Sequence, residues 1–255
     1  MTALLLAAVG AGAGLFGALM GVGGGLIVVP ALTQVLGVPF PRAVAVSLAV
    51  IVVSSSASSA AYVETGLTDI RTGVFLELAT VAGAIAGSVL AAHVPPAGLL
   101  ALFAAVTWLT AGTVWRRRGR SGEGLRAGEA PVHGWGKGMG VSFVAGAVSG
   151  LIGVGGGFLK VPAMSLLMGL PFKVAAATSN FMIGVTAATS AYVYAARGDL
   201  DLAVAAPTVV GVYAGARLGT RLLPRIPAAR LQGAFALVLA VIGSRMALDA
   251  WRMLR

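Results

Sequence analysis

The pentapeptide Gly-Val-Gly-Gly-Gly occurs twice without change, at residues 21–25 and again at residues 153–157, 132 positions later. The same offset pairs further residues along both halves without a gap. These pairs include Pro30 with Pro162, Ser47 with Ser179, Tyr62 with Tyr194, Asp69 with Asp201, and Gly83 and Gly87 with Gly215 and Gly219. One half of the chain is therefore a copy of the other. Internal duplication with matched Gly and Pro interruptions is typical of transporters and indicates where their binding site lies.

Composition places both copies in a membrane. The chain is 58% hydrophobic and 10% charged, whereas a soluble domain is about one quarter charged. Apolar runs of about 17–25 residues, the length that crosses a bilayer, recur throughout. We therefore expect an all-α polytopic membrane protein in the cell (plasma or inner) membrane. The net charge of +10 does not indicate a nucleic-acid partner, because the basic residues gather at segment ends and in one linker, as membrane topology requires.

The duplication predicts a first transmembrane repeat at residues 1–115, a linker at 116–136 and a second repeat at 137–255. Each repeat contains five apolar segments. They are roughly 3–20, 26–36, 42–63, 72–92 and 97–115, and then 137–152, 158–168, 173–196, 200–222 and 227–251. The second segment of each repeat has about 11 residues and covers only about 17 Å, near half of the hydrocarbon core. We expect it to be a half-helix that follows a break at the glycine run.

The linker sets the predicted topology. Its charged residues are Arg116, Arg117, Arg118, Arg120, Glu123, Arg126 and Glu129. The positive-inside rule places this basic loop in the cytoplasm. An odd number of crossings per repeat then gives the halves opposite orientations, which is an inverted repeat. The inversion survives if each short segment instead folds as a hairpin with the segment before it.

The two glycine runs are the first candidate site. The free N–H groups and the positive dipole end at the start of a half-helix bind anions, and two inverted copies direct two such ends at one point near the midplane. The substrate-binding candidates are Gly23, Gly24, Gly25, Gly155, Gly156 and Gly157, with Pro30 and Pro162 as helix-breaking residues. Close helix packing is the alternative, and it is the preferred explanation of the isolated pairs Gly83/Gly87 and Gly215/Gly219.

Lys160 is the sharpest single candidate. It follows the second glycine run, and its counterpart in the first repeat is Val28. An ionisable residue at membrane depth is costly and is by default functional, and its charge favours an anionic substrate. The alternative is a lysine that extends to the nearer interface.

Polar residues in the third segments form a further candidate. Ser179 and Asn180 stand in the second repeat, and Ser47 matches the serine in the first, where Leu48 replaces the Asn. They either line the substrate pocket or form interhelical hydrogen bonds, which are worth about 0.6–2 kcal/mol.

Arg217 and Glu77 are candidates for gating or ion coupling. Their counterparts are the apolar Ile85 and Val209. Arg217 either attracts an anion at a gate or anchors its helix at the interface. Glu77 either carries a coupling proton, as acids in transporters do, or pairs with a basic residue. Asp69 and Asp201, at loop-to-helix boundaries, are expected to be N-caps.

No enzyme or metal centre is predicted. The chain has no Cys, and its two histidines, His93 and His133, are not near a carboxylate at metal-ligand spacing. No nucleophile–base pair is visible.

The duplicated G-x-G-G-G-x-x-x-x-P run, at residues 21–30 and 153–162, resembles the signature of the TauE/SafE family of membrane transporters. Both copies also carry the following G-[VL]-P-F, at residues 37–40 and 169–172, and a G-x-x-D that ends at Asp69 or Asp201. The resemblance covers essentially the whole chain outside the linker. It implies a secondary carrier that exports sulfite or a small organosulfonate anion, driven by a gradient of H+ or Na+ and without a nucleotide or other cofactor.

Several alternatives remain open from the sequence. One alternative is a carrier for another small anion, and a second is a carrier that works in uptake rather than export. A third is a passive anion channel. A membrane scaffold or an intramembrane enzyme is disfavoured because catalytic groups are missing. Substrate, coupling ion, direction and oligomeric state do not follow from the sequence.

Overall fold

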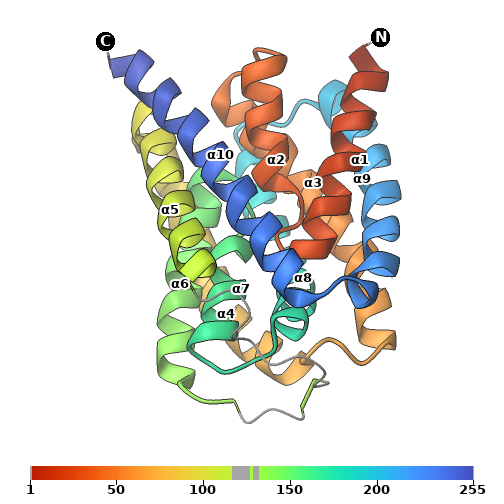
Figure 1. Cartoon of the computed structure of the whole chain (residues 1–255). Helices are drawn as coiled ribbons and strands as arrows, with labels where there is room; N and C mark the ends of the chain where they lie inside the picture. The colour runs from red at the N-terminus through yellow and green to blue at the C-terminus, as the bar shows by residue number, and fades with distance from the viewer. Residues whose placement is uncertain (1, 117–126, 129–131, 255) are drawn as a thin grey trace.

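The computed structural model describes residues 2–116, 127–128 and 132–254 and is all-α in this part of the chain (Figure 1). The helices of the first half are α1 (Thr2–Met20), α2 (Gly25–Pro30), α3 (Phe40–Glu64), α4 (Ile70–Leu90) and α5 (Pro96–Arg116). Those of the second half are α6 (Trp135–Ile152), α7 (Gly157–Leu166), α8 (Phe172–Ala196), α9 (Leu202–Leu222) and α10 (Ala228–Leu254). Each predicted segment is thus a helix, and the short second segments are α2 and α7. Most of the basic linker lies outside the described residues.

Within the described residues, six helices are long and apolar enough to cross a membrane, namely α1, α3, α4, α5, α9 and α10. The third helix of the second half, α8, is as long as α3, at 25 residues each. It carries buried Thr, Ser and Asn residues and packs on α3, α4 and α7. The chain is therefore a multi-pass helical membrane protein.

The two halves interleave and do not form separate bodies. α1 packs along α9, and the matching pair α6 and α4 packs in the same way. α3 packs on its own counterpart α8, and α5 packs on its counterpart α10. Each of these long helices therefore has its main neighbour in the other half of the chain, whereas the short α2 and α7 pack mainly within their own half.

Glycine pairs form the closest of these contacts. A Cβ added at Gly83 or Gly87 would collide with the backbone of α6 at Phe143 or Ala147. At Gly215 it would collide with the backbone of α1 at Ala11. The packing interpretation of these pairs is confirmed, since only glycine lets the helix backbones approach so closely.

The two half-helices, α2 and α7, run toward opposite ends of the bundle. Both chain termini lie at the upper end in Figure 1, and α6 begins at the lower end. The segment after α7 contacts the lower end, where the N–H of His133 donates to the carbonyl of Met168 at 3.2 Å. The segment after α2 instead lies against the C-terminal turns of α10, where Gln34 bonds to Asp249 at 2.7 Å.

The helix break lies at the glycines and not at the prolines. α7 continues through Pro162 to Leu166, so the prediction that Pro162 breaks its helix is wrong. α2 does end at Pro30, but the chain continues directly as a π-helix at Ala31–Val35. In each case the glycines have already ended the preceding helix, and a proline removes only one further hydrogen bond.

Candidate functional site

Each glycine run forms a tight loop between two helices, α1 and α2 in the first half and α6 and α7 in the second. Gly21, Gly23 and Gly24 have φ values of +73°, +70° and +83°, and Gly153, Gly155 and Gly156 have +71°, +74° and +70°. A residue with a Cβ adopts this left-handed conformation only at a cost. The repeated glycines are therefore what allows α1 to stop and α2 to start within five residues, and α6 and α7 likewise.

The two loops contact each other, and the predicted serines join them. The hydroxyl of Ser47 on α3 donates to the carbonyl of Gly153 at 2.7 Å. The hydroxyl of Ser179 on α8 donates to the carbonyl of Gly21 at 2.6 Å. A Cβ at Gly157 would collide with the Gly21 carbonyl. The structure thus brings both glycine loops and both serines to one place, and the serines bond across the halves.

Asn180 is also an interhelical contact. Its Nδ2 donates to the carbonyl of Ala18 on α1 at 2.9 Å, and its own carbonyl accepts from the hydroxyl of Ser55 on α3. Its Oδ1 is buried and has no hydrogen-bond partner among the described residues. The hydrogen-bonding alternative is observed, and one acceptor remains unused.

Protein atoms surround the glycine loops. A Cβ at Gly24 would lie 2.7 Å from the carbonyl oxygen of Ala13, and one at Gly156 would lie 2.8 Å from that of Ala145. Side chains of Ile51 and Ile183 approach Gly23. The first backbone hydrogen bonds into the two half-helices come from Ile27 and Leu159. The earlier N–H groups, at Gly25, Leu26, Gly157 and Phe158, precede these bonds and have no backbone partner within the described residues. The packing alternative is therefore observed, while the N–H groups that an anion site needs remain available.

Lys160 forms a buried ionic cluster with Glu77 and Thr186. Its Nζ lies 3.2 Å from Oε2 of Glu77 and 3.1 Å from Oγ1 of Thr186. The Thr186 hydroxyl donates to Oε1 of Glu77. Lys160 and Glu77 are 1% and 9% exposed, and they are the charged side chains buried within the described residues. Lys160 therefore does not extend to the interface, and Glu77 has the pairing role.

The same place in the other half carries no charge. Lys160, Glu77 and Thr186 correspond to Val28, Val209 and Ser54. Val28 is fully buried in an apolar cluster against which Val209 packs. The ionic cluster is thus present on one side of the duplicated bundle only.

Arg217 is not part of the ionic cluster. It is on the exposed side of α9, where its guanidinium lies 5.7 Å from the ring centre of Tyr213. This position fits the interfacial anchor. Asp69 and Asp201 are N-caps as expected, since Asp69 accepts from the N–H of Thr72 at 3.0 Å and Asp201 from that of Ala203 at 2.9 Å.

Thr186 was missed by the sequence reasoning. A signal was present, because Lys160 and Glu77 are both charged where the first copy, or the second, has Val. Two isolated charges that appear at apolar positions of one duplicated fold are expected to neutralise each other, since an unpaired buried charge is strongly destabilising. The third helix of each copy also keeps a hydroxyl here, as Ser54 or Thr186.

Comparisons with known proteins give a consistent family. The family described as Sulfite exporter TauE/SafE matches residues 6–246. A probable membrane transporter protein, YunE, from Bacillus subtilis (strain 168) is 28% identical over 271 residues, which cover 96% of this chain and 97% of that protein. A probable membrane transporter protein from Xylella fastidiosa (strain 9a5c) is 28% identical over 257 residues, covering 98% and 97%. No solved structure matches.

Proposed function

This chain belongs to the Sulfite exporter TauE/SafE family and is a membrane transporter, and from that premise we propose that it is a secondary carrier that exports sulfite or a small organosulfonate anion. In this proposal the anion binds near the membrane midplane beside the two glycine loops. The bundle exposes the site to one side of the membrane at a time. A gradient of H+ or Na+ is coupled to the movement.

The observation that carries the proposal is the buried cation at the start of α7. The N–H of Lys160 donates to the carbonyl of Gly156 at 3.1 Å, so Lys160 belongs to the first turn after the second glycine loop. The N–H groups of Gly157 and Phe158 precede it. A lysine, free N–H groups and the positive end of the helix dipole at one place all favour a negative charge.

Glu77 provides a physical reason for coupling. Removing the partner of a buried charge costs about 3–5 kcal/mol, so Lys160 needs an anion beside it in every state. When Glu77 takes up a proton, a substrate anion replaces its carboxylate as that partner. The proton and the anion then cross together, so export requires an outward gradient of the anion that exceeds the opposing inward gradient of the coupled ion. If Na+ is the coupling ion, Glu77 and Thr186 supply oxygen ligands, and the substrate again pairs with Lys160.

Counterflow in proteoliposomes tests the function. The panel is sulfite, sulfoacetate, taurine, sulfate and acetate. We expect saturable exchange of sulfite or sulfoacetate that an opposing gradient of the same anion accelerates. Flux that stays linear with concentration identifies a channel. Saturable exchange of acetate or sulfate alone would refute the proposed substrate but support the proposed carrier mechanism.

The variant Lys160→Met tests the site. We expect it to raise the substrate concentration at half-maximal rate or to abolish transport in a folded protein. Lys137→Met is the matched control, because Lys137 is exposed near the start of α6. Unchanged transport of every anion by Lys160→Met refutes the role of Lys160 in binding.

A further inference from the structure

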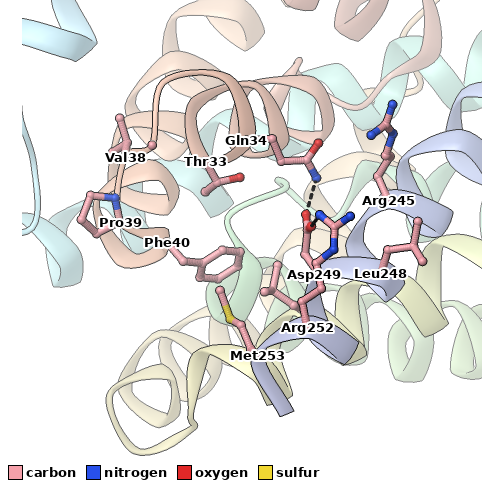
Figure 2. A pocket seen from close by; sticks show the side chains of 12 residues that line it. Thr33, Gln34, Val38, Pro39, Phe40, Arg245, Leu248, Asp249, Arg252 and Met253 are labelled. Atoms are coloured by element: carbon pink, nitrogen blue, oxygen red, sulfur yellow. Dashed lines mark hydrogen bonds and ion pairs between the residues drawn. The ribbon is translucent and has the colours of Figure 1, made fainter. Parts of the chain in front are cut away.

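A wide pocket opens at the end of the bundle that holds the termini. Its volume is about 590 Å³. One wall comes from the π-helix after α2 and the start of α3, including Thr33, Gln34 and Phe40, and the other from α5 and α10. Figure 2 shows Arg245, Asp249 and Arg252 of α10 facing Gln34 across it.

The duplication places a second pocket at the corresponding position of the other half. Adding 132 to four residues that line the wide pocket gives residues that line a much smaller one. Thr33, Gln34, Phe40 and Leu100 become Ser165, Leu166, Phe172 and Gln232. The volume of this second pocket is only about 10 Å³. One pocket of the pair is therefore open and the other is closed.

The two pockets lie at opposite ends of the bundle. The wide pocket is lined by Arg252 and Met253, close to the C-terminus. The narrow pocket is lined by Val114, near the end of α5, and by Leu166, at the end of α7. That end of α7 leads to Met168, which bonds to His133 just before α6. The narrow pocket is thus at the end of the bundle where α6 begins.

The segments that line the two pockets also differ in their helix type. On the open side, residues Ala31–Val35 form a π-helix. On the closed side, the corresponding residues continue α7 as a regular α-helix as far as Leu166. Thr33 lies in this π-helix, and its hydroxyl donates to the carbonyl of Val29 at 2.9 Å. π-helical turns are rare and frequently occur at functional sites.

A polar contact joins the two walls of the open pocket. Gln34 Nε2 donates to Oδ2 of Asp249 at 2.7 Å, and Arg252 lies 3.7 Å from Oδ1 of the same carboxylate. The closed pocket has the apolar Leu166 in place of Gln34. Arg245 and Arg252 bring two positive charges to the open pocket against one negative charge from Asp249. Such a balance attracts small anions to the opening.

We propose that the two pockets are the two gates of one transport path, with the wide pocket as the vestibule for the anion at the terminal end and the narrow pocket as the closed gate at the other. This inference rests on the proposed carrier function. Transport then interconverts this state with one in which the pocket at Thr33 is closed and the pocket at Ser165 is open. The contact between Gln34 and Asp249 belongs to the state in which the pocket at Thr33 is open.

Thiol labelling of the naturally Cys-free chain tests the gates. Thr33→Cys and Ser165→Cys are the matched pair, and Thr65→Cys, exposed after α3, is the control for reagent access. A water-soluble methanethiosulfonate reagent is added to both faces of protein in nanodiscs. We expect Thr33→Cys to react at least about tenfold faster than Ser165→Cys, because the minor state of such a pair is populated at about 10% or less. Leu166→Cys repeats the measurement if Ser165→Cys does not fold.

A cross-link separates this inference from the choice of substrate. Gln34→Cys and Asp249→Cys are joined as a disulfide, with copper phenanthroline and oxygen as the oxidant, and released by reduction. We expect the cross-link to abolish the residual labelling of Ser165→Cys without any substrate present, and to stop transport reversibly. If none of the panel anions is transported but the cross-link still abolishes labelling at Ser165→Cys, the gates stand and the proposed substrate fails. If transport is measurable and the cross-link changes neither labelling nor transport, the inference is overturned.

Discussion

Ser47 and Ser179 are 132 positions apart, and each fixes the glycine loop of the opposite half. Ser47 donates to the Gly153 carbonyl at 2.7 Å, and Ser179 donates to the Gly21 carbonyl at 2.6 Å. The hydrogen bonds therefore cross between the copies in a matched pair. These two contacts tie each glycine loop to the third helix of the other half.

Removing either serine hydroxyl is expected to destabilise the bundle. Ser47→Ala and Ser179→Ala each take the partner from a buried carbonyl, which costs about 1–3 kcal/mol. Thermal unfolding in detergent measures the loss. Ser56→Ala is the control, because the Ser56 hydroxyl donates only to Val52 in its own helix. Equal stability of all three variants would show that the crossed bonds do not hold the loops.

The ionic cluster predicts a single variant that is worse than a double one. Lys160→Val leaves Glu77 buried without its cation and is expected to lower the free energy of unfolding by about 3–5 kcal/mol. Adding Glu77→Val recreates the Val28 and Val209 arrangement of the other half, so most of the loss should be recovered. Denaturant unfolding compares the two. A double variant as unstable as the single one would assign the loss to packing and not to an unpaired charge.

Substitution of the loop glycines is expected to cost more than backbone strain alone. Gly24→Ala places a methyl at φ +83° and 2.7 Å from the Ala13 carbonyl oxygen. Gly198→Ala is the matched control, because its φ is +79° but nothing lies within 4 Å of the new Cβ. The left-handed conformation costs about 1–2 kcal/mol at both positions, so the excess at Gly24 measures the contact. Stabilisation by sulfoacetate should persist in Gly198→Ala and disappear in Gly24→Ala, and its persistence in both would separate the loop from binding.

Much of the fold was predictable because it is local and duplicated. The apolar segments, the glycine breaks and the caps at Asp69 and Asp201 depend on nearby residues, and the second copy repeats each signal. The packing of Gly83 and Gly215 followed from spacing alone. The error at Pro162 arose because its effect depends on where the helix has already ended.

The site was less predictable because its contacts are long-range. Lys160 and Glu77 were each identified alone, but their pairing depends on how α4 packs beside α7 and α8. The crossed hydrogen bonds of Ser47 and Ser179 also join residues that are far apart in the sequence, so they depend on the tertiary structure. The wide pocket could not be found from the sequence, since it forms where the segment after α2 meets α5 and α10, and that meeting depends on how distant helices pack.

The last prediction concerns membrane orientation. The C-terminal ends of the matched helices α3 and α8 are expected to lie on opposite sides of the membrane. α3 ends at Glu64, and nearby Gly66 accepts a hydrogen bond from the N–H of Ala127 at 3.4 Å, so this end is beside the basic linker. α8 ends at the corresponding Ala196, and the adjacent Arg197 bonds to the carbonyl of Ser88 near the far end of α4 at 3.3 Å. Both positions are exposed. With the linker in the cytoplasm, an impermeant maleimide added outside intact cells should label Ala196→Cys and leave Glu64→Cys unlabelled until the cells are opened. The reverse pattern would place the linker outside, and labelling of both from one side would refute the inversion of the repeats.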